Sequence, residues 1–269
     1  MRPFKSIYLF IFLLGTCLLI FHCATTGPGG KKAVILISTE QEVSIGKQMA
    51  GEVDKEYKTS QDTVVQNYIS RVGNKLVQVS DRKDLEYHFT VIDSKEINAF
   101  AIPGGYIYIY TGLLKLMESE AELAGVLGHE VGHIVARHGV RRLQQVIGIS
   151  ILLDIALGKS SEAVKQGVSV GIGLMLQGFS RENELEADYD AIFYMSRAGY
   201  NPHGMVDLLK KLNELDKSGK NVIEKLAADH PPTVKRIEAA QQNLDSLGYA
   251  NSTLPLMQED YKKIKDRLK

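Results

Sequence analysis

Apolar residues recur at helical spacing through most of the chain. Thr39 and Glu42 form a capping-box pair that predicts a helix to about residue 57. A second helix is predicted over 62–79, where valine, isoleucine and leucine recur every three or four residues. Further helices are predicted nearer the C-terminus, followed by a helical tail: 182–198, 202–216 and 231–247.

Three short strands interrupt this helical pattern, at 87–93, 97–102 and 106–111. Pro103-Gly104-Gly105 is typical of a turn between the last two. Ser119 and Glu122 then form another capping box, and the helix that they open is predicted to run to about His138. The predicted fold class is α+β and mainly helical, with a small antiparallel sheet beside that helix.

An apolar, glycine-rich region covers residues 146–179 and is broken by a polar stretch at 158–162. Its first half is short and contains Asp154, while its second half contains Lys165 and two glutamines. A membrane-spanning helix needs about 20 mostly uncharged residues, which neither half provides. We predict a pair of helices that are buried or cover a functional site.

The N-terminus has the pattern of a leader followed by a tether. Arg2 and Lys5 precede an apolar run over 7–21, which predicts a secretory signal peptide at residues 1–22. Cys23 follows directly and begins a glycine-rich tether over 23–36. This arrangement resembles a bacterial lipoprotein acylation site.

Two alternatives to acylation at Cys23 stay open. Cys17 is a rival acylation site, although its use would leave four apolar residues exposed at the mature N-terminus. The apolar run could also be an uncleaved membrane anchor. All three arrangements place the remainder outside the cytoplasm, as a domain over 37–250 and a helical tail over 251–269.

Composition and charge narrow the class of protein. The chain is 44% hydrophobic and 24% charged with a net charge of zero, as in ordinary folded proteins, and nothing indicates a nucleic-acid partner. The two cysteines both lie in the leader and tether region, so the predicted domain contains no disulfide. Its stability must come from a core and from any bound metal.

The segment His129-Glu130-Val131-Gly132-His133 carries the strongest chemical signal. Histidines at positions i and i+4 of a helix share one face, so both can bind one tetrahedral cation, and zinc suits imidazole ligands. Glu130, about 100° further round the helix, can act as a general base on a water molecule. His138 is expected to point away, about 140° from His133. Two surface histidines are the alternative.

A catalytic zinc needs a third protein ligand. On the acid-rich helix, Glu184 and Asp188 share the apolar side, whereas Glu186 and Asp190 fall on the opposite, solvent-facing side. Acids on an apolar face are costly unless they are paired or bind metal. We therefore predict Glu184 as the third ligand and Asp188 as the hydrogen-bond partner of a ligand histidine. A solvated acidic helix is the alternative.

Small residues along the motif helix would let another backbone approach closely: Gly125, Gly128, Gly132 and Ala136. Together with the two predicted acids, the motif resembles peptidase family M48 of the gluzincin metallopeptidases. The resemblance extends to His230-Pro231 with Arg236 six residues on, and to the segment from Asn98 to Gly105. It covers nearly all of the chain after Cys23.

The resemblance implies roles for two further places. The segment Asn98, Ala99, Phe100 and Ala101 would lie in an edge strand beside the cleft, where an extended peptide pairs through backbone hydrogen bonds. His230 and Arg236 would lie near the cleft, where a cation could stabilise an oxyanion. His230 could instead cap the open position of the metal. Without the resemblance, these would be an ordinary hairpin strand, a helix-capping histidine and a solvated arginine.

The implied function is a zinc endopeptidase with one Zn²⁺ per chain. The expected substrates are extended, unfolded or misassembled polypeptides, and the lipid anchor would place the protein at the periplasmic face of a bacterial membrane, the outer membrane being favoured. A lipid-anchored chaperone that rarely cuts its clients is the main alternative, although a structural zinc has no use for Glu130. A zinc hydrolase of cell-wall amides is a weaker third possibility.

Overall fold

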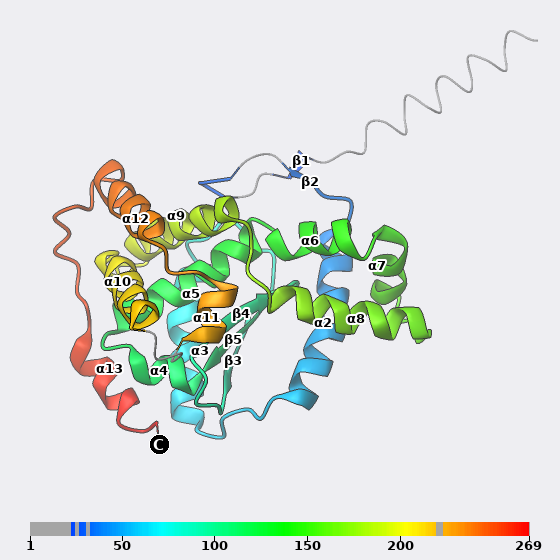
Figure 1. Cartoon of the computed structure of the whole chain (residues 1–269), viewed down its shortest axis with the longest axis horizontal. Coiled ribbons are helices and arrows are strands. Elements are labelled where there is room, and N and C mark those ends of the chain that lie inside the picture. Colours follow the sequence, from blue (N-terminus) through cyan, green and yellow to red (C-terminus); the bar gives the residue numbers. More distant parts are fainter. Residues whose placement is uncertain (1–22, 25–26, 31–32, 219–222, 269) are drawn as a thin grey trace, which may run out of the picture.

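The computed structural model describes residues 23–24, 27–30, 33–218 and 223–268. The predicted signal peptide and Cys17 therefore lie outside the described residues. Helices surround a small sheet and a central helix, α5, whose residues are all buried (Figure 1). The helices are α2 (Thr39–Glu56), α3 (Thr63–Val77), α4 (Thr111–Leu116), α5 (Glu120–Val135), α6 (His138–Val146), α7 (Ile149–Ala156), α8 (Glu162–Met175), α9 (Arg181–Arg197), α10 (His203–Lys217), α11 (Glu224–Asp229), α12 (Val234–Ser246) and α13 (Gln258–Lys265).

The predicted fold class is confirmed, but the sheet is mixed rather than wholly antiparallel. Its strands are β3 (His88–Ile92), β4 (Ala99–Ile102) and β5 (Tyr106–Tyr110). Their order is β3-β5-β4, with β5 antiparallel to β4 and parallel to β3. After β3, the chain crosses to the edge of the sheet to form β4. It then turns back, and β5 lies between β3 and β4, parallel to β3.

The hairpin between β4 and β5 depends on glycine. Gly104 and Gly105 have φ of +81° and +95°, a region that residues with a Cβ rarely adopt. A Cβ on Gly105 would also lie 2.3 Å from the Glu86 carbonyl oxygen. The Pro-Gly-Gly turn predicted from the sequence is therefore required by the backbone path.

The start of α2 differs from the prediction. The capping box is formed by Ser38 and Gln41 rather than Thr39 and Glu42. Glu42 is instead buried and pairs with Arg82 Nη1 at 3.0 Å and with Arg137 Nη2 at 2.8 Å. Its carboxylate thus links α2 to the segment that follows the C-terminal end of α5.

The central helix also ends earlier than predicted. Arg137 adopts a left-handed conformation, with φ 54° and ψ 33°, and a separate helix, α6, begins at His138. Non-glycine residues rarely occupy this region. The side chains after Arg137 therefore do not point in the directions expected if α5 continued past this residue.

Close packing of α5 against α9 brings the two chemically active helices together. A Cβ on Gly128 would lie 3.2 Å from the Ala191 Cα, and one on Gly132 would lie 3.1 Å from the Ala187 Cα. The small-residue contact predicted for this helix is thus confirmed. It lets the acidic residues of α9 reach the histidines of α5.

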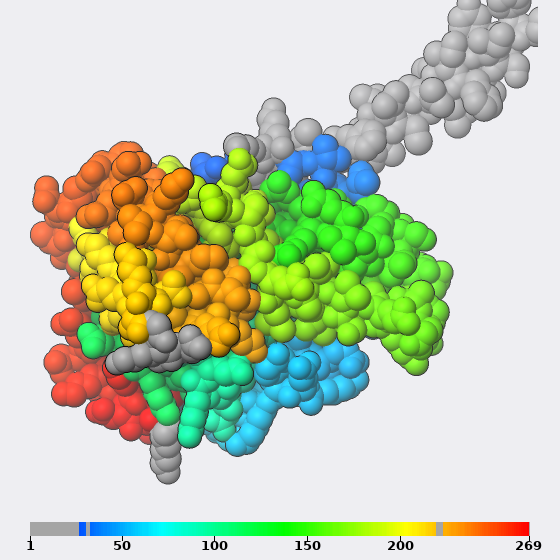
Figure 2. Space-filling model, in the orientation of Figure 1, coloured from blue at the N-terminus to red at the C-terminus, as the bar shows by residue number. Residues whose placement is uncertain are grey.

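The apolar region 146–179 forms the predicted pair of helices, α7 and α8, beside α2 (Figure 1). Within the described ranges, no helix is long and apolar enough to cross a membrane. The loop after α8 packs against α11, since a Cβ on Gly178 would lie 2.5 Å from the Asp229 carbonyl oxygen. In Figure 2 the orange α11–α12 segment adjoins the yellow-green α8–α9 segment.

Candidate metal centre

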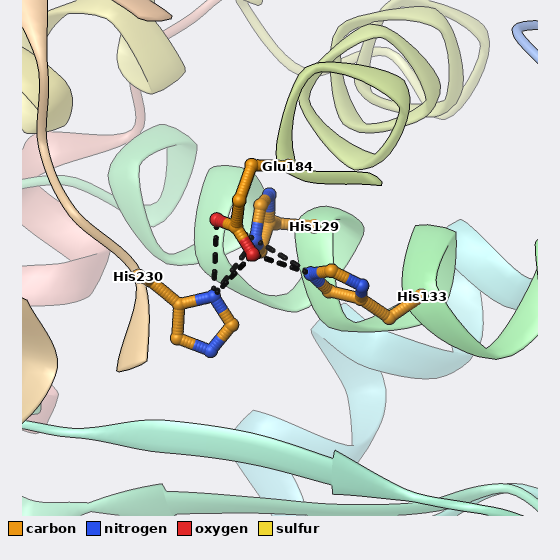
Figure 3. A group of neighbouring side chains, drawn as sticks. All are labelled: His129, His133, Glu184 and His230. Atoms are coloured by element: carbon orange, nitrogen blue, oxygen red, sulfur yellow. Dashed lines mark hydrogen bonds and ion pairs between the residues drawn. The ribbon is translucent and has the colours of Figure 1, made fainter. Parts of the chain in front are cut away.

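The two motif histidines project from successive turns of α5 toward α9 (Figure 3). Their Nε2 atoms lie 3.0 Å apart, and both side chains are buried. A helix provides this spacing because residues four apart share one face.

Glu184 reaches the same point from the first turn of α9. Its Oε2 lies 3.4 Å from His129 Nε2, and its Oε1 lies 3.4 Å from His133 Nε2. The start of α9 is fixed by Ser180, whose hydroxyl accepts a hydrogen bond from the Asn183 amide at 3.3 Å.

These three groups fit a tetrahedral cation. Bonds of 2.0–2.1 Å to nitrogen and oxygen imply ligand atoms about 3.3 Å apart at the corners of a tetrahedron. The two histidine nitrogens are 3.0 Å apart, and each lies 3.4 Å from a different oxygen of the Glu184 carboxylate, distances close to that value. Two imidazoles and a carboxylate are also a donor set that zinc prefers.

His230 lies immediately after α11 and completes a buried group of four possible ligands (Figure 3). Its Nδ1 lies 3.3 Å from His129 Nε2 and 3.1 Å from Glu184 Oε1. Its Nε2 faces Glu130 Oε1 at 3.8 Å. One imidazole nitrogen therefore lies among the metal donors and the other beside the predicted base.

Glu130 is 2% exposed, and burial raises the pKa of its carboxyl. A carboxyl whose pKa is shifted toward neutrality can take up and release a proton at working pH. Glu130 lies next to the donor group, beside His230, without belonging to it, so its carboxyl is available for proton transfer near a bound metal.

Asp188 and Arg236 form a buried ion pair behind the donors. Arg236 Nε and Nη2 donate to the two oxygens of Asp188 at 2.8 and 2.7 Å, and Arg236 Nη1 lies 2.8 Å from Glu184 Oε2. Asp188 Oδ1 lies 2.9 Å from His129 Nδ1. Burial opposes the negative charge of Asp188, but Arg236 and His129 together lower its pKa. Arg236 is thus paired with the carboxylates of both Glu184 and Asp188.

The predicted peptide-binding segment forms the start of β4 and the residue before it. Ala99, Phe100 and Ala101 are buried, and the Phe100 ring stacks on Tyr108 with centroids 4.9 Å apart. Asn98 Nδ2 donates to Asp229 Oδ2 at 2.8 Å. The Phe100 side chain therefore belongs to the core, and what β4 can offer a substrate is its backbone edge.

His138 does not point away as the helical wheel predicted. Its Nδ1 lies 2.8 Å from His133 Nδ1, and its Nε2 lies 3.4 Å from Glu186 Oε2. The prediction was wrong because it continued α5 through the left-handed Arg137. Glu186, predicted to face solvent, has a side chain only 12% exposed.

Phe179 is a site residue that the sequence did not single out. Its ring stacks on His133 with centroids 4.4 Å apart, and Arg142 Nη1 donates to the Gly178 carbonyl beside it at 3.0 Å. The only sequence signal was its position at the end of the apolar region, whose helices were predicted to be buried or to cover a functional site. The loop between α8 and α9 therefore closes one side of the donor group.

An apolar pocket is lined in part by His129, Glu130, His230 and Arg236. It is bounded by one turn of α5, by α10 and by the neighbouring α4, β4 and α11. The apolar residues that line it are Ala99, Leu113, Val126, Met205, Leu208, Leu209, Leu212 and Leu226. Such a surface can hold an apolar side chain next to the predicted base.

Asp190 is a second residue of α9 that was wrongly predicted to face solvent. It is fully buried beneath the N-terminal segment, where its Oδ1 accepts a hydrogen bond from the Gly29 amide at 3.1 Å. Burial raises the pKa of Asp190 to about 8. Helical periodicity within α9 could not predict this burial, because the residues that cover Asp190 are distant in sequence.

The raised pKa of Asp190 predicts a pH dependence of stability. The unfolded carboxyl loses its proton near its ordinary pKa of 3.8, while the folded one keeps it until about 8. The stabilising contribution is therefore complete below about pH 4 and is lost as pH rises toward 8. Between pH 6 and pH 7, we expect the free energy of unfolding to fall by about 1 kcal/mol relative to that of Asp190→Asn. Urea titrations of both proteins at each pH measure this difference. A difference in unfolding free energy that does not change with pH would contradict the raised pKa of Asp190.

Comparison with known proteins agrees with the geometry. The profile of peptidase family M48 matches residues 64–244. The chain is 28% identical over 229 residues to a beta-barrel assembly-enhancing protease of Yersinia pestis, covering 81% of this chain and 47% of the relative. It is 32% identical over 177 residues to the mitochondrial metalloendopeptidase OMA1 of Schizosaccharomyces pombe, covering 65% and 52%.

A third relative is the metalloprotease LoiP of Escherichia coli, 27% identical over 165 residues, or 60% of this chain and 64% of the relative. The chain spans about half the length of the first two relatives. The matched residues lie inside the predicted domain 37–250, whose limits stay a prediction. They include every member of the buried donor group, and the chain belongs to peptidase family M48.

Proposed function

We propose that the protein is a zinc-dependent endopeptidase with one zinc ion held by His129, His133 and Glu184. The observation that carries this proposal is that the two histidine Nε2 atoms, 3.0 Å apart, meet the Glu184 carboxylate, which has one oxygen 3.4 Å from each of them, with a buried carboxyl one residue after the first histidine. A metal with a purely structural role would not need that carboxyl.

Zinc held there would polarise the scissile carbonyl and lower the pKa of a water molecule. Glu130 would accept a proton from the attacking water and pass it to the leaving amine. Its raised pKa suits both steps, since the carboxylate must take up a proton and release it again within each cycle. His230, whose Nδ1 lies 3.3 Å from His129 Nε2, would be a further ligand of the metal in the absence of a substrate.

The substrate is proposed to be an extended polypeptide lying along β4. In the described sheet, β5 is the only strand paired with β4, so the outer edge of β4 is not paired with a strand, and such an edge can bind an added one. The Ala99 amide at this edge donates to the Asn98 side chain at 2.9 Å. Ala99 belongs both to this strand and to the apolar pocket. A side chain next to the scissile bond would therefore enter the pocket.

The pocket predicts a cleavage preference for an apolar residue next to the scissile bond. Val126→Leu adds a methylene to the pocket wall, one turn before Glu130, and should shift the preference from leucine toward alanine by about 10-fold in kcat/KM. Paired peptides that differ at this one position measure the shift. Val234→Leu, on the exposed surface of α12, is the matched control and should change nothing. Unchanged selectivity in Val126→Leu would exclude this pocket as the binding site.

We propose that Cys23 carries a lipid anchor that holds the domain at the periplasmic face of the outer membrane. The leader pattern supports the anchor. The Yersinia relative is named a beta-barrel assembly-enhancing protease, and by analogy we propose a role in the quality control of envelope proteins. Cys23→Ala should abolish labelling by a radioactive fatty acid, whereas Cys17→Ala should leave it intact. The reverse result would move the anchor to Cys17.

A tethered chaperone is the competing function, because a protein of this shape could hold clients along β4 without cutting them. Purified protein lacking residues 1–22 is incubated with unfolded casein, with zinc or with a chelator. The proposal predicts casein fragments that appear with zinc and disappear with the chelator. Intact casein bound by the zinc-loaded protein would favour the chaperone.

A further inference from the structure

The two histidines of the proposed zinc site have different partners on their outer nitrogens. His129 Nδ1 faces the carboxylate of Asp188 at 2.9 Å, while His133 Nδ1 faces His138 Nδ1 at 2.8 Å. A neutral imidazole that binds metal through Nε2 carries its proton on Nδ1, and this proton needs an acceptor. His133 therefore depends on another imidazole where His129 has a carboxylate.

This contact fixes the tautomer of His138. Two nitrogens 2.8 Å apart share a single proton, so if His133 Nδ1 donates, His138 Nδ1 must accept. The proton of a neutral His138 then lies on Nε2. That atom is 3.4 Å from Glu186 Oε2, which is an acceptor. His138 Nε2 makes no hydrogen bond within the described residues, so Glu186 favours the proton on this nitrogen through its nearby charge rather than as a bonded acceptor.

The left-handed backbone conformation of Arg137 directs the His138 side chain toward His133. On a continuous helix, His138 would lie about 140° from His133. The left-handed Arg137 is held by its Nη2 group, which donates to the Ile37 carbonyl at 2.8 Å and lies 2.8 Å from Glu42 Oε2. Unfavourable backbone conformations that buried hydrogen bonds and ion pairs stabilise are common at functional sites.

We propose that His138 is a positioning residue of the metal centre. Together with Glu186, it holds His133 in the tautomer and ring orientation that direct Nε2 to the metal. This inference rests on the proposed zinc site. The competing explanation is that His138 only fills space next to Phe179, whose ring centroid lies 5.8 Å away.

Two substitutions of similar size separate these explanations. His138→Leu fills the space without an acceptor, whereas His138→Asn keeps a side-chain oxygen near the position of Nδ1. Zinc affinity is measured by competition with a chromogenic chelator, without any substrate. We expect His138→Leu to weaken zinc binding by about 10- to 100-fold and His138→Asn to retain most of it. His203→Leu, at a histidine outside the site, should bind zinc as the wild type does.

Equal weakening by leucine and asparagine, or wild-type affinity in His138→Leu, would overturn the inference. A wild type that binds no zinc would overturn the proposed function as well. Long-range ¹H–¹⁵N spectra of the zinc-loaded wild type add a test that needs no variant. They should show a protonated Nδ1 on His133 and an unprotonated Nδ1 on His138, and a proton on His138 Nδ1 would overturn the inference.

Discussion

Glu130→Gln should lower kcat for casein cleavage by about 10²- to 10⁴-fold, the range that a positioned general base contributes. Glutamine has nearly the same shape as glutamate but cannot accept a proton from water. Glu130 does not belong to the group of possible metal ligands, and the closest ionic contact of its carboxylate is with His230 Nε2 at 3.8 Å. Zinc content and folding should therefore be unchanged.

The measurement compares the two proteins at equal zinc occupancy, determined by mass spectrometry of the intact, metal-loaded chains. Glu238→Gln, on α12 and outside the group of buried charged residues, is the matched control and should cleave as the wild type does. Cleavage by Glu130→Gln at the wild-type rate would rule out the proposed proton transfer, whatever the metal content.

Glu184→Ala should have the second large effect, through loss of the metal. Zinc affinity should fall by more than the 10- to 100-fold that is typical for a partner outside the ligand set, and cleavage should fall with it. The variant also leaves Arg236 Nη1 without the carboxylate that lies 2.8 Å from it. Zinc binding is measured by chelator competition, so a loss of activity alone does not decide the result.

Glu182→Gln provides the control on the same helix, one position after its start and outside the donor group. It should retain both zinc and activity. Full zinc occupancy in Glu184→Ala, with a wild-type affinity, would show that another residue is the third ligand. His230, which already lies among the donors, would then be the candidate.

Local periodicity was sufficient to predict the part of the site that lies on regular helices. His129 and His133 share a face because they are four residues apart, and the same rule placed Glu184 and Asp188 on one side of α9. The glycines of α5 predicted the close helix contact that brings the two helices together. Within one regular helix, the direction of a side chain depends only on its position.

The failures occur where the chain departs from a regular helix or where distant segments meet. His138 was misplaced because one left-handed residue, Arg137, separates it from α5. Asp190 was assigned to solvent because its cover comes from Gly29, which is 161 residues away in the sequence. The parallel pairing of β3 with β5 likewise depends on the order of strands in space. None of these long-range arrangements leaves a periodic signal.

The central claim is that one zinc ion is held by His129, His133 and Glu184. A crystal of the zinc-loaded protein, measured at the zinc absorption edge, tests this most directly through the anomalous difference map. We predict a single anomalous peak about 2.0–2.2 Å from Nε2 of each histidine and from a carboxylate oxygen of Glu184. A zinc-loaded protein with no peak between these three side chains, or with its only peak elsewhere, would contradict the account.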